Sequence, residues 1–122
     1  MAGSISIKRV YEKPVSSDGR RVLVDRIWPR GLTREAASID EWLKELGPST
    51  ALRKWFGHSP ARWDEFCERY RSELAGEAVA PLLRRLSDVA AKQPLTLVYS
   101  ARDELHNQAV VIAGVLSDLR RR

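Results

Sequence analysis

Cysteine is almost missing from this chain. Its 122 residues include one cysteine, Cys67. A single cysteine cannot form an internal disulfide or complete a structural zinc site, so the composition excludes a secreted disulfide scaffold and a zinc module. Because Cys67 lies on an apolar helical stripe, we expect an inert thiol that packs against the core, and we expect no metal site.

Long hydrophobic runs are also missing. No segment is apolar over the length that a transmembrane helix requires, and residues 1–4 lack the apolar core of a signal peptide. These two absences predict a cytoplasmic protein that has no membrane partner.

What is present is typical of one folded domain, which we expect to span residues 1–122. Hydrophobic residues make up 43% of the chain and charged residues 30%. Lysine and arginine number 21 against 16 aspartate and glutamate, which gives a formal net charge of +5. This excess favours an anionic partner. Nucleic acid is one such partner, but net charge alone predicts only an attractive electrostatic field and does not identify a binding surface.

The strongest pattern lies near the C-terminus. An apolar run at residues 95–99 is followed by a polar loop and then by helical spacing from His106 onward. The helix is apolar on nearly all sides, so both elements should be buried. A buried strand followed by a buried helix is typical of a covered, parallel sheet, whose ligands bind beyond the carboxyl ends of the strands. We therefore expect the functional edge to include residues 100–108.

Two further strands are expected at residues 5–10 and 21–27, and the direction of the first one stays open. The middle of the chain is helical. A capping box at residues 38–41 predicts a helix that ends at Gly47, and further helices should begin near Ser49, near Ser59 and after Gly76. The expected fold is α/β, with a small, mainly parallel sheet of three or slightly more strands covered by about five helices.

Arg26 and Arg30 follow the central strand and should reach the same edge as Ser100. Their guanidinium groups suit a phosphate or carboxylate, and the helix amides that follow Asn107 should attract the same anion. The alternative is structural: Asp103 only caps the helix, and Arg26 forms an ion pair with an aspartate.

His106 and Asp103 are candidates for proton transfer, because a histidine at a helix start favours its neutral form. The alternative is a histidine that only packs and hydrogen-bonds. Ser100 is a candidate ligand-binding residue and a weak candidate nucleophile, since no G-x-S-x-G motif surrounds it.

Residues 52–58 mix basic and aromatic side chains. Arg53 and His58 could close over an anion, which makes both candidate ligand-binding residues. The same segment supports a different hypothesis, a basic nucleic-acid or protein-interaction module that uses Arg53, Lys54 and Trp55 with the arginine-rich ends of the chain. Such binding would weaken steeply with salt.

Three segments, Val24-Asp25-Arg26-Ile27-Trp28-Pro29-Arg30-Gly31, Leu52-Arg53-Lys54-Trp55-Phe56-Gly57-His58 and Tyr99-Ser100-Ala101-Arg102-Asp103-Glu104-Leu105-His106-Asn107, carry a family resemblance. Over essentially its whole length the chain resembles the YeaO-like branch of the family called domain of unknown function 488. The resemblance implies a compact α/β fold of bacterial, cytoplasmic type, with no known cofactor and no established reaction. A longer branch of that family carries cysteine where Ser100 stands, so the serine argues against thiolate chemistry of the phosphatase or rhodanese kind.

Overall fold

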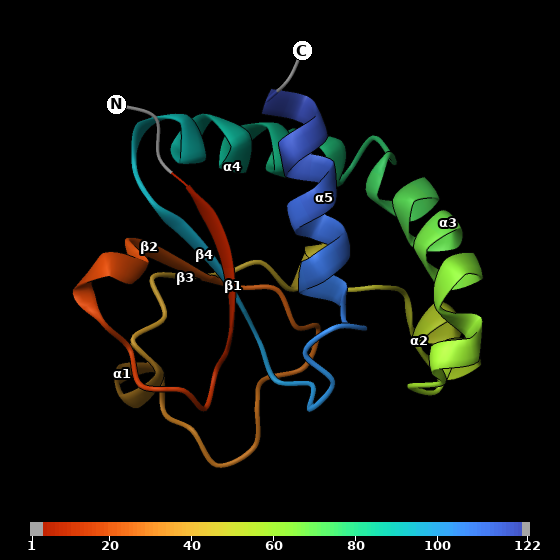
Figure 1. Cartoon of the computed structure of the whole chain (residues 1–122), viewed down its shortest axis with the longest axis horizontal. Coiled ribbons are helices and arrows are strands. Elements are labelled where there is room, and N and C mark those ends of the chain that lie inside the picture. The colour runs from red at the N-terminus through yellow and green to blue at the C-terminus, as the bar shows by residue number, and fades with distance from the viewer. Residues whose placement is uncertain (1–3, 121–122) are drawn as a thin grey trace.

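The computed structural model describes residues 4–120, which contain one sheet of four parallel strands (Figure 1). The strands lie in the order β1 (Ile5–Arg9), β4 (Leu95–Tyr99), β2 (Arg20–Leu23) and β3 (Glu41–Trp42). The predicted α/β class and mainly parallel sheet are therefore confirmed.

The direction of β1, which the sequence left open, is parallel to β4. Their register runs from Ile5 opposite Leu95 to Arg9 opposite Tyr99. β2 pairs with the other side of β4, from Arg20 opposite Leu95 onward. Because β1, β4 and β2 run the same way, the loops that follow them all leave from one edge of the sheet. The loop after Ser100 and the segment after Val24 therefore meet there.

The number of α-helices within residues 4–120 is five, the number predicted, although α1 is not one of the predicted helices: α1 (Arg34–Ala37), α2 (Thr50–Phe56), α3 (Trp63–Leu74), α4 (Ala80–Lys92) and α5 (Gln108–Arg120). Short 3-10 turns occupy Ser16–Asp18, Lys44–Leu46 and Pro60–Arg62. α4 and α5 pack against the sheet, and α3 packs beside α5 with α2 against it (Figure 1). The opposite face carries a smaller apolar cluster to which α1 contributes Ala37.

β4 is buried along its whole length because both faces of the sheet are covered. Leu95, Leu97 and Tyr99 belong to the main core under the helices, whereas Val98 belongs to the smaller cluster on the other face. This explains the continuous apolar run, since a strand with one solvated face would alternate instead.

The capping box at residues 38–41 predicts a helix that ends at Gly47, and this prediction is wrong. Ser38 instead ends α1 in the left-handed conformation, with φ 51°, and α1 begins after Thr33, whose side chain accepts from the Ala36 amide. Glu41 and Trp42 pair with Val22 and Leu23 as the edge strand β3. Pairing with β2 outweighs the local capping pattern, which is a tertiary effect that no short window of sequence contains.

Other boundaries are close to those expected. Ser49 caps α2, and Gly57 ends it in the left-handed conformation with φ 53°. The central strand, β2, ends at Leu23, sooner than the predicted strand at residues 21–27. The Val24 amide still donates to the Val98 carbonyl of β4. α5 begins at Gln108 and not at His106, because Asp103 and Asn107 form a capping turn before it.

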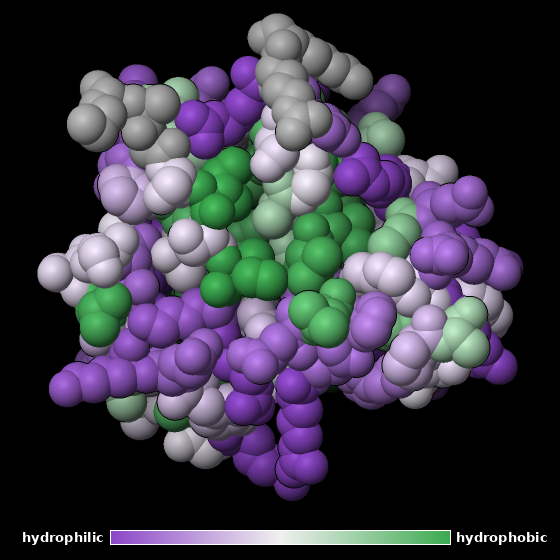
Figure 2. All heavy atoms as spheres, in the orientation of Figure 1, coloured by the Kyte–Doolittle hydropathy of each residue, from purple (hydrophilic) through white to green (hydrophobic). Residues whose placement is uncertain are grey.

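Within residues 4–120, no helix is both long enough and apolar enough to cross a membrane. The face shown in Figure 2 carries apolar side chains around β1 and the outer side of α5, surrounded by hydrophilic residues. Ile5 and Ile7 of β1 and Val115 of α5 are half-buried and pack against the main core.

Candidate functional site

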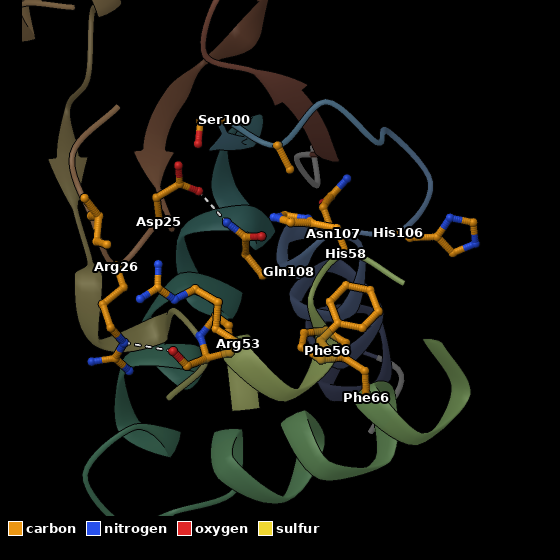
Figure 3. A pocket seen from close by; sticks show the side chains of 13 residues that line it. Asp25, Arg26, Arg53, Phe56, His58, Phe66, Ser100, His106, Asn107 and Gln108 are labelled. Carbon is orange, nitrogen blue, oxygen red and sulfur yellow. Dashed lines mark hydrogen bonds between the residues drawn. The ribbon is translucent and has the colours of Figure 1, made fainter. Parts of the chain in front are cut away.

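A pocket of about 220 Å³ lies at the carboxyl edge of β2 and β4, where the sequence places the functional edge. Its lining comes from the segments that follow β2 and β4, the beginning of α5, α2 with the turns on either side of it, and Phe66 of α3 (Figure 3). The polar side chains that line it are Asp25, Arg26, Arg53, His58, Ser100, His106, Asn107 and Gln108.

Asp25 is the buried carboxylate of this pocket. It follows Val24 at the end of the buried β2 segment and is 5% exposed. Gln108 donates from its amide to one carboxylate oxygen (Figure 3), and Ser100 hydrogen-bonds through its hydroxyl and its backbone. Burial raises the pKa of Asp25 above its usual range, and the bonds from Ser100 and Gln108 offset part of that effect.

Arg26 lines the pocket but also holds its wall. Its Nε donates to the Pro48 carbonyl at 2.9 Å and its Nη2 to the Gly47 carbonyl at 2.6 Å. Gly47 lies so close to the Arg26 backbone that a Cβ added to Gly47 would be 2.9 Å from the Arg26 backbone nitrogen. Neither Asp25 nor Asp103 forms an ion pair with Arg26 among residues 4–120. Two of the five N–H donors of Arg26 are therefore used by the chain.

Arg53 reaches the pocket from α2 and is exposed. In Figure 3 its side chain extends towards the side of the pocket where Asp25 and Arg26 lie. His58 lies just after α2 and holds a left-handed backbone, with φ 56°. Phe56 and Phe66 stack at 4.4 Å between ring centroids and form the apolar wall below these groups.

Asn107 is buried, and its side chain serves the turn before α5. Its oxygen accepts from the Val110 amide at 3.2 Å, and its nitrogen donates to the Asp103 carbonyl at 2.9 Å. It therefore acts as the N-cap of α5, which holds the first amides of that helix beside the pocket.

His106 and Asp103 pair with each other. The His106 Nδ1 lies 2.9 Å from Asp103 Oδ2, and the ring packs edge-on against Trp63 at 5.1 Å. The pKa of Asp103 is lowered, first by the Leu105 amide and then by the His106 side chain. Although His106 lines the rim of the pocket, Figure 3 shows its ring pointing away from Asp25 and Ser100.

Arg30 lines a second, more open hollow and not the pocket that contains His106. This hollow shares Ile27, Arg53 and Ser100 with the pocket, so the two are adjacent. Its cationic side chains are Arg9, Arg30, Arg53 and Arg102. Asp25 is the only acidic residue that lines either space within residues 4–120.

Sequence reasoning named Ser100, Arg26, Arg53, His58, His106 and Asn107, all of which line the pocket. It missed Asp25 and Gln108. One signal for Asp25 was available: a carboxylate that directly follows three consecutive apolar residues, 22–24, at the expected functional edge. Gln108 carried no such signal, because its role depends on where α5 places it.

Across residues 4–120, no group of three histidine, cysteine, aspartate or glutamate side chains is arranged to hold a metal ion. Cys67 is half-buried, and burial raises the pKa of its thiol, with Asp64 acting in the same direction. The thiol is therefore poorly suited to form a reactive thiolate.

A family model described as "Inactive DUF488-N3 subclade" matches residues 4–122. The chain belongs to the DUF488 family. Among its relatives is the uncharacterized protein YeaO of Escherichia coli (strain K12), which is 47% identical over 95% of this chain and 99% of its own length. No solved structure shows a significant match to this DUF488 chain.

Mycobacterial relatives extend the family further. Uncharacterized protein Rv3073c of Mycobacterium tuberculosis (strain ATCC 25618 / H37Rv) and uncharacterized protein Mb3100c of Mycobacterium bovis (strain ATCC BAA-935 / AF2122/97) are each 39% identical over 93% of this chain and 93% of their own lengths. These matches support the YeaO-like branch that the three sequence segments indicated.

Proposed function

We propose that this DUF488 protein binds a small anionic ligand, bearing a phosphate or a carboxylate, at the carboxyl edge of β2 and β4. The observation that carries the proposal is the charge distribution around the two adjacent hollows. Arg26, Arg53 and three further arginines line them, against the single carboxylate of Asp25. Guanidinium groups beside the first amides of a helix favour an oxyanion.

Arg53 is the principal contact in this proposal. It lines both hollows and comes from α2, whereas Arg26 already donates to the Gly47 and Pro48 carbonyls. Arg53 therefore offers a whole guanidinium group to a ligand, and Arg26 contributes mainly by keeping the opposite wall in place.

The proposed activity is binding without turnover. A proton-transfer role for His106 and Asp103 would need the imidazole to face the ligand, but the ring is directed towards Trp63 and Asp103. The family description, which calls the subclade inactive, agrees with this proposal.

The test is calorimetric titration of the wild-type protein, Arg53→Gln and Lys54→Ala with ethyl phosphate and with propionate. Removing the Arg53 charge should weaken binding of the preferred anion about tenfold or more, because a hydrogen bond to a charged group contributes about 1.5–3 kcal/mol. Lys54 is the matched control, since it is the exposed neighbour on α2 and lines neither hollow.

Two results would overturn the proposal. One is an affinity that falls equally in both variants, which would indicate nonspecific attraction by net charge. The other is binding of a single-stranded oligonucleotide, steeply weakened by salt, with neither small anion bound. The second result would establish the basic interaction module instead. The guanidinium groups of Arg62 and Arg69 lie over the ring of Trp55. A nucleic-acid base could stack on this ring only after displacing an arginine.

A further inference from the structure

Asp25 is a buried carboxylate whose charge no cationic side chain neutralises directly. None of the ion pairs among residues 4–120 includes it, and its hydrogen bonds come from the neutral groups of Ser100 and Gln108. Burying a carboxylate in this way costs free energy unless a cation or further donors reach it. A carboxylate offers about four acceptor positions, so lone pairs stay available to a ligand.

The same pocket also presents a positive group, the side chain of Arg53. Asp25 lies where β2 and β4 end, whereas Arg53 enters from α2, with Phe56 and Phe66 forming an apolar wall. A simple anion seated beside an ionised Asp25 would be repelled by it. A ligand that also carries a cationic group would turn this repulsion into an attraction.

We propose that the pocket selects a small zwitterion, whose ammonium group donates to Asp25 and whose phosphate or carboxylate binds Arg53. This inference rests on the anion binding proposed above and identifies the ligand class for that site. The cavity of about 220 Å³ limits the ligand to a compact molecule, since drug-sized ligands occupy roughly 300–1,000 Å³. Asp25 is then the residue that determines specificity.

The experiment compares aminoalkyl phosphates of two to four carbons with alkyl phosphates of the same lengths, titrated calorimetrically into the wild-type protein at pH 7.5. Each pair differs only in the ammonium group. The best aminoalkyl phosphate should bind about tenfold or more tightly than its alkyl partner, as expected for a hydrogen bond between charged groups. In Asp25→Asn that ratio should fall to less than about threefold, while the alkyl phosphate binds at least as tightly as before.

The outcomes separate the two proposals. Alkyl phosphates that bind, with no gain from the ammonium group in the wild type, would overturn the zwitterion and leave the anion site standing. No binding by either series would overturn both. An undiminished ratio in Asp25→Asn, folded by circular dichroism, would show that another group recognises the amine. The comparison of aminoalkyl with alkyl phosphates uses the wild-type protein alone. It therefore tests the proposal even if Asp25→Asn does not fold.

Discussion

At the scale of single residues, identical side chains have different roles according to the partners that the fold supplies. Arg26 and Arg53 both line the pocket, yet two carbonyl groups hold two donors of Arg26 in place, whereas Arg53 is exposed on α2. The sequence shows only that both are arginines near an expected edge. Which of them is available to a ligand depends on the turn at Gly47, which lies more than twenty residues further along the chain than Arg26.

Tyr70 holds the same turn from the core side, which gives a residue-scale prediction. It is fully buried, and its hydroxyl donates to the Leu46 carbonyl. Tyr70→Phe removes that donor and leaves the buried carbonyl without it, so the free energy of unfolding should fall by about 1–3 kcal/mol. Urea denaturation measures this change.

The matched control is Tyr11→Phe. The Tyr11 hydroxyl also donates to a carbonyl, that of Arg30 at 3.0 Å, but Tyr11 is 47% exposed and water can replace the bond. Its free energy of unfolding should change by less than about 0.5 kcal/mol. Equal losses in the two variants would contradict the explanation by burial.

At the scale of elements, the sequence predicts those helices and strands that have a local capping pattern or a continuous run of buried, apolar residues. β4 was predictable because it is apolar on both faces, and α2 because Ser49 and Gly57 mark its two ends. β3 was not predictable, because two residues carry no periodicity and their state depends on pairing with β2. The same limit applies to the pocket: the polar residues that follow single strands were identifiable, whereas the meeting of Asp25 with Gln108 depends on the packing of α5.

Ser49 joins two helices, which gives an element-scale prediction. Its hydroxyl accepts from the Leu52 amide at 3.2 Å and donates to Glu73 on α3 at 2.5 Å. Ser49→Ala removes the cap of α2 and a link to α3, so the free energy of unfolding should fall by about 1–2 kcal/mol. Ser72→Ala is the control, because Ser72 is exposed on α3. Equal denaturation midpoints for the two variants would contradict a capping role.

At the scale of the whole molecule, charged side chains are arranged differently at the two ends of the parallel strands. The carboxyl edge leaves Asp25 without an ion pair and gathers arginines around open space. The amino edge satisfies its charges internally: Arg21 lies 2.7 Å from Asp18, and Arg21 also donates to the Ser38 and Ala37 carbonyls. This difference supports the proposal that a ligand binds at the carboxyl edge.

The network around Asp18 links β1, β2 and β4 and therefore supports a prediction about global stability. Lys8 and Arg21 bind the Asp18 carboxylate, and Thr96 donates to its backbone carbonyl. Burial raises the pKa of Asp18, but the Val15 amide, Lys8 and Arg21 outweigh that effect and hold the pKa below its usual range. Asp18→Asn leaves Arg21 buried beside a neutral group, so the free energy of unfolding at pH 7 should fall by about 3 kcal/mol.

The pH dependence follows from the direction of that shift. A carboxyl group whose pKa is lower in the folded state stabilises the protein above its unfolded pKa of about 3.9, and this contribution is lost as the pH falls through the folded value. The stability difference between wild type and Asp18→Asn should therefore be largest near neutral pH and shrink below about pH 4. Urea denaturation from pH 7 to pH 3 measures it, with Asp88→Asn on the exposed side of α4 as the control. A difference that stays constant over this range would show that the variant acts through packing and not through the charge of Asp18.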